Sequence, residues 1–201
     1  MTIPENLGSK RIGILGGSFN PAHRGHLHVS RQALKLLQLD EVWWMVSPQN
    51  PLKSSDNMAT LRTRIKSAQS IAKDRRIRVT DIEIDLGTNY TAKTLKELKR
   101  AFPQVRFVWL MGADNLMQIP KWKNWQSIFK TMPIAVFTRP TYTNRALAGI
   151  AAQSFSRYRV DENRAHRLSI MQAPAWSFLN IKPDPISATR VRAGIGAVKL
   201  Y

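Results

Sequence analysis

The feature that most constrains the fold of this chain is an apolar run that ends in two glycines and leads into a helical pattern. The run at 11–15 is typical of a buried strand, and residues 25–37 place leucines at helical spacing. Between them stands GGSFNPAHRGH, residues 16–26. Because Gly16 and Gly17 carry no side chain, a phosphate can approach their backbone closely, and Gly25 allows a second close approach. The N–H groups that open a helix add positive potential, so this stretch predicts a phosphate site in an α/β fold.

Apolar strands and amphipathic helices alternate along the rest of the chain. Strands are expected at 11–15, 41–47, 77–84, 105–111, 133–138 and 175–181, and helices at 25–37, 59–72, 91–101, 113–119 and 187–197. This order predicts one α/β domain over residues 1–201, with a mostly parallel sheet between two helix layers. Residues 140–170 are the least regular region and a candidate flexible insertion. Ligands of such folds sit at the carboxyl ends of the strands, so the loops after Leu15, Ser47 and Met111 are the expected site.

The composition indicates a basic protein with anionic partners. The 201 residues include 31 Lys and Arg against 13 Asp and Glu, a formal net charge of +18. The basic residues are spread out, and we interpret them as a solvated surface. One of the densest groups is Arg62, Arg64, Lys66, Lys73, Arg75, Arg76 and Arg78. An RNA-binding module would explain the charge, but it would need aromatic residues on an exposed sheet, and the strands here look buried. No nucleic-acid partner is therefore expected.

Three function classes are excluded because the chain contains no cysteine: disulfide scaffolds, thiolate zinc sites and cysteine nucleophiles. Residues 1–11 lack an apolar core of signal-peptide length. No apolar run approaches the roughly 18–20 residues that span a bilayer. We therefore expect a soluble cytoplasmic protein without a membrane partner, for which a homo-oligomer remains open.

Two histidines carry the sharpest chemical signal. His23 and His26 are three residues apart, so on a helix they project from one side and can together donate hydrogen bonds to phosphate oxygens. One alternative is that they only cap the helix. Another is a metal site with His28, but that ring would point well away, and no cysteine or nearby carboxylate completes a zinc shell. We interpret the pair as phosphate ligands, and His28 and His166 as packing or surface residues.

Four motifs carry a resemblance to a known family. GGSFNPAHRGH, with ISATRVR at 186–192, resembles the paired signatures of the HxGH nucleotidyltransferases. Within them, FVWLMGADNLMQIPKWKNW at 107–125 and NYTAKTL at 89–95 resemble the bacterial nicotinate-nucleotide adenylyltransferases. The resemblance runs from about residue 11 to residue 192. It implies a Rossmann-like fold and transfer of AMP from ATP to nicotinate mononucleotide, which gives nicotinate adenine dinucleotide and pyrophosphate in NAD synthesis.

The resemblance also implies roles for individual residues. The attacking phosphate is already anionic, so no general base is needed and catalysis is positioning and charge stabilisation. Catalytic roles fall to His23, His26, Lys53 and Arg192. ATP would be bound by Gly16, Gly17, Ser18, Phe19, Gly25, Gly112, Asp114, Ser187 and Thr189. The acceptor would be bound by Asn89, Tyr90, Thr91, Ala92 and Trp122. Magnesium would be carried by ATP with water ligands, so no metal-ligating residue is expected.

Some of these roles are more specific than others. Trp122 is expected to stack on the pyridine ring, and Thr91 and the backbone of Ala92 to receive its carboxylate. Asp114 is expected to bind ribose hydroxyls or orient its loop, with a helix N-cap as the alternative. Trp43, Trp44 and Trp125 are expected to be packing residues.

The sequence departs from the family pattern at two motif positions, and two alternative acceptor substrates stay open. Ala188 replaces a serine that many relatives have, and Leu52 replaces a histidine before the loop lysine. Nicotinamide mononucleotide and phosphopantetheine remain alternative acceptors, and the region around Trp122 argues against the latter.

Overall fold

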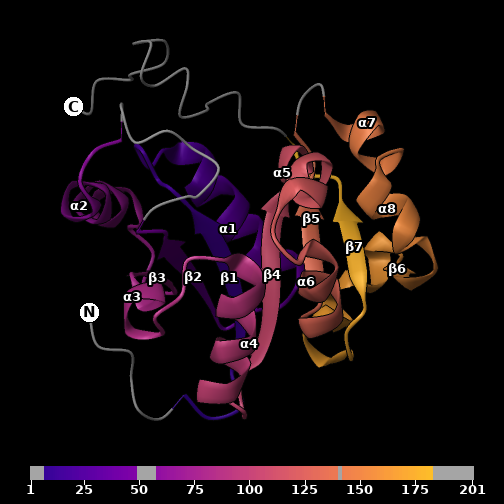
Figure 1. Ribbon diagram of the computed structural model, residues 1–201, viewed down its shortest axis with the longest axis horizontal. Helices are drawn as coiled ribbons and strands as arrows, with labels where there is room; N and C mark the ends of the chain where they lie inside the picture. Colours follow the sequence, from indigo (N-terminus) through magenta and orange to yellow (C-terminus); the bar gives the residue numbers. More distant parts are fainter. Residues whose placement is uncertain (1–6, 49–57, 140–141, 183–201) are drawn as a thin grey trace.

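A computed structural model describes residues 7–48, 58–139 and 142–182 of the chain. Within these ranges one all-parallel sheet of seven strands runs through the molecule in the order β3-β2-β1-β4-β5-β7-β6 (Figure 1). The strands are β1 (Arg11–Gly17), β2 (Glu41–Val46), β3 (Ile77–Thr80), β4 (Arg106–Gly112), β5 (Ile134–Phe137), β6 (Arg159–Val160) and β7 (Trp176–Leu179). The order changes direction between β1 and β4, which pair side by side in parallel.

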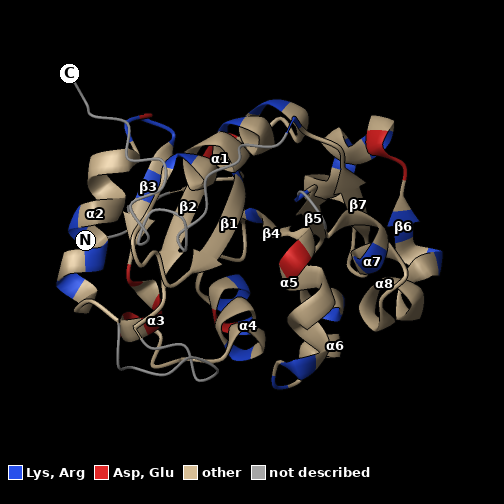
Figure 2. Cartoon of the chain, turned by 90° about the horizontal axis from the view of Figure 1, so that it is seen from above, with Lys and Arg blue, Asp and Glu red and all other residues tan. Residues whose placement is uncertain are grey.

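Helices cover both faces of this sheet, as Figure 2 shows for α1 on one side and α4, α5 and α6 on the other. The first face carries α1 (Arg24–Leu36), α2 (Leu61–Ile71) and the 3-10 helix η3 (Glu162–Ile170). The second carries α3 (Ile82–Asp85), α4 (Thr91–Ala101), α5 (Ala113–Gln118), η1 (Ile119–Lys121), α6 (Trp125–Thr131), α7 (Thr143–Leu147), α8 (Ile150–Ser154) and η2 (Ser156–Tyr158). No helix in the described ranges is long and apolar enough to cross a membrane.

The strands are apolar throughout because each is buried on both faces. Along β4, Val108 and Leu110 pack into the core under α1, while Trp109 and Met111 pack into the core under α4 and α5. Continuous apolar runs of this kind are what a buried parallel sheet requires. The expected three-layer α/β fold with a mostly parallel sheet is therefore confirmed.

Two expected boundaries differ from the structure. Gly16 and Gly17 do not form a turn but close β1, where they pair with Met45 and Val46. The strand expected at 77–84 ends at Thr80, because the Thr80 hydroxyl accepts a hydrogen bond from the N–H of Ile82 and the chain turns into α3. A side-chain acceptor that competes with the sheet ladder is a common way for threonine to end a strand.

The expectation of a flexible insertion at 140–170 is wrong for the part of it that is described. Ala146, Ala151 and Phe155 are buried in the core under α5, and Leu168 of η3 is buried on the opposite face. The Trp176 indole donates a 2.8 Å hydrogen bond to the carbonyl of Phe155, which fastens this region to β7. Short helices and one two-residue strand lack the long periodicity by which a sequence pattern is recognised.

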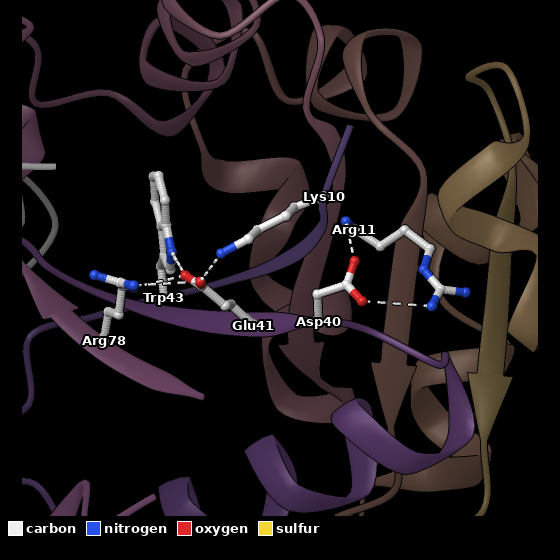
Figure 3. A network of polar contacts seen from close by, with 6 residues as sticks. All are labelled: Lys10, Arg11, Asp40, Glu41, Trp43 and Arg78. Carbon is white, nitrogen blue, oxygen red and sulfur yellow. Dashed lines mark hydrogen bonds and ion pairs between the residues drawn. The ribbon is translucent and has the colours of Figure 1, made fainter. Parts of the chain in front are cut away.

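Charged residues fasten the amino ends of the first strands (Figure 3). The buried carboxylate of Glu41, at the start of β2, accepts hydrogen bonds from Lys10 Nζ at 2.6 Å, Arg78 Nε at 2.6 Å and Trp43 Nε1 at 3.0 Å. Burial raises the pKa of Glu41, but these donors outweigh it and hold the pKa below its ordinary value. Asp40 pairs with Arg11 beside this cluster. The opposite, carboxyl edge of the sheet carries the candidate site.

Candidate active site

The candidate site lies where the strand order reverses. Gly17 ends β1 and Gly112 ends β4, and these neighbouring parallel strands finish at the same edge of the sheet. The chain leaves β1 toward α1 on one face, and it leaves β4 toward α5 on the other. A crevice at such a switch point is the usual ligand site of open α/β sheets. The loop with the histidine pair and the loop with Asp114 therefore open onto one edge.

The histidine pair begins α1. His23 is the N-cap residue, and the two ring centroids lie 3.8 Å apart. The N–H of His23 donates to Nδ1 of His26 at 3.2 Å, and the N–H of His26 donates to the carbonyl of His23 at 3.0 Å. Nδ1 of His26 therefore caps the helix, as one of the alternatives expected. Because that nitrogen accepts, the proton of a neutral ring sits on Nε2, the tautomer that can donate to a phosphate oxygen.

Aromatic rings pack against the histidine pair. The Phe19 ring lies 4.7 Å from the His26 ring and 5.2 Å from the Trp44 ring. Trp44 Nε1 donates to the hydroxyl of Ser30 at 2.7 Å, and that hydroxyl donates to the carbonyl of His26 at 2.9 Å. Trp44 is buried, as expected of a packing residue, and it also fixes the first turn of α1 to β2.

Packing requires two of the glycines at this edge and leaves a third free of close neighbours. A Cβ on Gly16 would collide with the Trp109 ring, and a Cβ on Gly112 would collide with the carboxylate of Asp114. A Cβ on Gly17 would reach only ordinary contact with Phe19, at 3.4 Å. Gly25 is buried in the first turn of α1. Protein packing alone therefore accounts for Gly16 and Gly112, whereas it does not require a glycine at position 17.

Asp114 faces a cation that sequence reasoning missed. It is the second residue of α5, whose N-cap is Gly112, so the N-cap alternative is wrong. Its Oδ1 lies 3.8 Å from Nε of Arg139, which follows β5 at the same edge of the sheet. The position of Arg139 directly after the strand expected at 133–138 was the signal that could have found it.

The residues expected to hold the acceptor gather around the start of α4. Tyr90 is its N-cap residue and Thr91 its first residue, with Ala92 buried behind them. Lys123 Nζ lies 4.6 Å from the centre of the exposed Tyr90 ring, which brings the segment containing half-buried Trp122 beside Tyr90. Trp125 packs edge-on against Phe129 and Phe155, as expected of a packing residue.

Arg64 contradicts the interpretation of its group as a solvated surface. Its side chain is 2% exposed and lies between the two loops at this edge. Nη1 donates to the carbonyls of Ser18 and Ser47 at 2.7 Å each, Nη2 to that of Pro48 at 2.8 Å, and Nε to that of Ala59 at 2.9 Å. Burial lowers the pKa of the guanidinium. Its place four residues before Ala68, on the apolar side of the helix, was the available signal.

Four of the expected site residues lie outside the described residues: Lys53, Ser187, Thr189 and Arg192. His28 lies apart from the pair and its Nε2 is 2.8 Å from the carbonyl of Lys182. Among the residues that the structure describes, no group of three or more His, Cys, Asp or Glu is placed to hold a metal ion.

Comparison with known proteins identifies the family. The cytidylyltransferase-like family model matches residues 14–194. A probable nicotinate-nucleotide adenylyltransferase of Parvibaculum lavamentivorans is 52% identical over 182 residues, which cover 90% of each chain. One of Gluconobacter oxydans is 51% identical over 90% of this chain and 93% of its own.

A solved structure shares the fold. Plasmodium falciparum nicotinic acid mononucleotide adenylyltransferase complexed with NaAD is 20% identical, with a TM-score of 0.66 over 92% of this chain and 83% of its own. Its likeness and the seven parallel strands agree on a Rossmann-like architecture. The family follows from the match to the family model and from the relatives about half identical to this chain: the chain belongs to the nicotinate-nucleotide adenylyltransferases of the cytidylyltransferase-like family.

Proposed function

We propose that this chain transfers AMP from ATP to nicotinate mononucleotide, forming nicotinate adenine dinucleotide and pyrophosphate in NAD biosynthesis. The observation that carries the proposal is the histidine pair. Two imidazoles 3.8 Å apart open α1 at the carboxyl end of β1, at the switch point of a parallel sheet. The names of relatives about half identical to this chain support the same reaction.

In this reaction the protein has to position the two substrates and stabilise the negative charge that develops on the α-phosphate. A phosphate oxygen of the acceptor attacks the α-phosphorus of ATP, a new P–O bond forms, and the bond to the β-phosphate oxygen breaks as pyrophosphate leaves. The nucleophile carries no proton to remove, so a general base is not required. We assign His23 and His26 to the α-phosphate oxygens, where donated hydrogen bonds stabilise the growing negative charge. Lys53, Ser187, Thr189 and Arg192 are assigned to the remaining phosphates.

The substrate on the ATP side is the magnesium complex. Magnesium keeps several waters and binds phosphate oxygens readily, so it can enter and leave with the nucleotide. The described donors near the pair are imidazoles and backbone N–H groups, which suit phosphate oxygens rather than the cation itself. We assign the backbone at Gly16, Gly17, Ser18, Phe19 and Gly25 to the nucleotide.

The acceptor is assigned to the start of α4 and the segment after η1. Thr91 and the N–H of Ala92 lie in the first turn of an eleven-residue helix, where the helix dipole favours a carboxylate. Half-buried Trp122 is assigned to stack on the pyridine ring, and Asn89 and Tyr90 to shape the entrance. Asp114, held over Gly112 and facing Arg139, is assigned to ribose hydroxyls.

Two broader features belong to the same proposal. We assign residues 1–201 to one domain, and the continuous sheet from β3 to β6 in the described part of the chain supports this assignment. The protein works in the cytoplasm, where its substrate ATP is available.

A panel of acceptors tests the proposal. The purified chain with magnesium and ATP is given nicotinate mononucleotide, nicotinamide mononucleotide or phosphopantetheine, and pyrophosphate release is followed. We expect the highest kcat/KM with nicotinate mononucleotide, because a site built for a carboxylate leaves a donor unpaired when the amide binds. Faster use of phosphopantetheine would overturn the assignment of the acceptor.

A further inference from the structure

A buried carboxyl group lies under the first turn of α4. Glu83, in α3, is only 3% exposed. Its Oε1 accepts a 2.8 Å hydrogen bond from the hydroxyl of Thr94, and the Thr94 oxygen lies 2.8 Å from the hydroxyl of Thr88. The carbonyl of Glu83 also accepts from the N–H of Thr88 at 2.9 Å. Glu83 therefore holds both ends of the segment 88–94 through side-chain and backbone contacts.

This segment is the one assigned above to the acceptor. Thr94 stands three residues after Thr91, and its hydroxyl and its N–H both approach the carbonyl of Tyr90, at 3.2 and 3.0 Å. Thr88, Thr94 and Glu83 are buried, whereas Tyr90 is exposed at the mouth of the site. The buried contacts thus fix the backbone from which the first N–H groups of α4 point.

The surroundings of Glu83 are polar but uncharged. The hydroxyl of Thr94, from α4, donates to Oε1 of Glu83, and the hydroxyl of Thr88, from the preceding turn, contacts that of Thr94. Ser47, directly after β2, also lowers the pKa of Glu83. The charged residues nearest to it in sequence are Asp81, Asp85 and Arg78, of which Arg78 is paired with Glu41, and the exposed Lys93 lies on α4. In the described part of the chain, no Lys, Arg or His forms an ion pair with Glu83.

Burial raises the pKa of Glu83, and the hydrogen bonds from Thr94 and Ser47 only partly offset this. The carboxyl group of Glu83 is therefore protonated more easily in the folded protein than in a free glutamate. A second negative charge close to the first turn of α4 would repel an acceptor that carries a carboxylate, and an uncharged acid would not.

We propose that Glu83 is a positioning and specificity residue of the acceptor site, whose contacts with Thr94 and Thr88 hold the first turn of α4 and orient the N–H groups that receive a ring carboxylate. The inference rests on the proposed function for the identity of the acceptor. Glu83 acts through its contacts with Thr94 and Thr88, which position the binding residues, and does not itself contact the substrate.

Glu83→Ala tests this inference through the separate kinetic constants. Loss of one buried hydrogen bond should raise KM for nicotinate mononucleotide about tenfold, while KM for ATP stays within about twofold. Glu83→Gln, which has the same shape and no charge, should restore KM for the acceptor. Glu97→Gln, on the exposed side of α4, is the matched control and should change neither constant.

The pH profile separates a specificity role from a structural one. In the wild type, KM for nicotinate mononucleotide should rise as pH rises through the elevated pKa of Glu83, and KM for nicotinamide mononucleotide should not. Glu83→Gln should remove that difference. If Glu83→Ala is too unstable to purify, Thr94→Val tests the same contact and should also raise KM for the acceptor.

The outcomes distinguish this inference from the function on which it rests. A wild-type chain that transfers AMP to nicotinate mononucleotide, with equal KM and pH profile in Glu83→Ala or Thr94→Val, contradicts the role of Glu83 alone. A wild-type chain that transfers no AMP to nicotinate mononucleotide contradicts the proposed function, and the role of Glu83 falls with it.

Discussion

One ring nitrogen of His26 makes a hydrogen bond within the protein and so contributes to stability as well as to ligand binding. Because Nδ1 of His26 accepts from the N–H of His23, His26→Ala removes a helix cap as well as a phosphate donor. We predict that His26→Ala lowers the free energy of unfolding by about 1 kcal/mol. Loss of one oxyanion donor should lower kcat by about 100-fold or more in either His26→Ala or His23→Ala.

Steady-state kinetics and urea denaturation of both variants check this prediction. His166→Ala is the control, because that residue is exposed and its Nδ1 lies 3.2 Å from the carbonyl of Asn163, away from the histidine pair. A His23 or His26 variant that keeps wild-type kcat removes the assignment of that residue.

Trp122 and Trp125 give a second prediction at this scale. Trp122→Ala should raise KM for the acceptor about tenfold, the value of one aromatic stacking contact, with kcat changed little. Trp125→Ala should instead lower stability, because its ring packs against Phe129 and Phe155. Initial rates at varied acceptor concentration decide between them. An unchanged KM in Trp122→Ala would show that another residue stacks on the ring.

Single residues were predictable where spacing alone defines their role. The separation of His23 and His26 places both rings on one side of α1 without knowledge of the fold. Arg139 could be placed at the strand end from the sequence, but its pairing with Asp114, like the contact of Glu83 with Thr94, exists only because the fold brings distant elements together.

Among the elements, α2 depends most on a residue that its pattern misplaces. At helical spacing, the apolar residues of 59–72 share one face: Leu61, Ile65, Ala68 and Ala72. Ala68 is buried and the other three pack against the core, as this face predicts, but Arg64 is buried as well. Arg64 reaches carbonyls of Ser18, Ser47 and Pro48, so it joins the loop after β1 to the loop after β2. The spacing of Arg64 from Ala68 indicates the buried side of the helix, but the partners of its guanidinium cannot be inferred from periodicity, because they are backbone atoms of distant segments.

We predict that Arg64→Met lowers the free energy of unfolding by about 3 kcal/mol, because four backbone carbonyls lose the donor that the buried guanidinium supplies. The loops that it joins should also lose their relative position, with a raised KM for ATP. Arg62→Met, exposed on the same helix, should alter stability by no more than about 0.5 kcal/mol. Denaturation midpoints of the two variants measure this, and equal midpoints would show that Arg64 does not hold the loops together.

The long elements and the short buried strands β5 and β7 were predictable, whereas the short helices were not. Strands β1, β2 and β4 and helices α1 and α4 lie within two residues of their expected bounds, because each presents a run or a period long enough to recognise. The helices α3, α7 and α8 have four or five residues each, so tertiary packing rather than periodicity defines them.

Across the whole molecule, the charged cluster at the amino ends of the strands gives stability a pH dependence. The pKa of Glu41 is lowered in the folded state, so its contribution is present above the unfolded pKa and is lost as pH falls through the folded pKa. We predict that Glu41→Gln costs about 2 kcal/mol at neutral pH, reduced from a fully buried pair because Lys10 and Arg78 are part-exposed.

The difference between Glu41→Gln and the wild type should shrink as pH falls toward about 3. Urea unfolding across this range tests it, followed by fluorescence and circular dichroism, which should coincide if 1–201 is one domain. A difference that stays constant with pH would show that Glu41 is not ionised in the folded protein.

The reaction itself is tested most directly by the products of the purified chain. Given magnesium, ATP and nicotinate mononucleotide, the wild type should release pyrophosphate and form nicotinate adenine dinucleotide in equal amounts, and His23→Ala should make both about 100-fold more slowly. Absence of the dinucleotide from the wild-type reaction, or wild-type rates in the variant, would contradict the account.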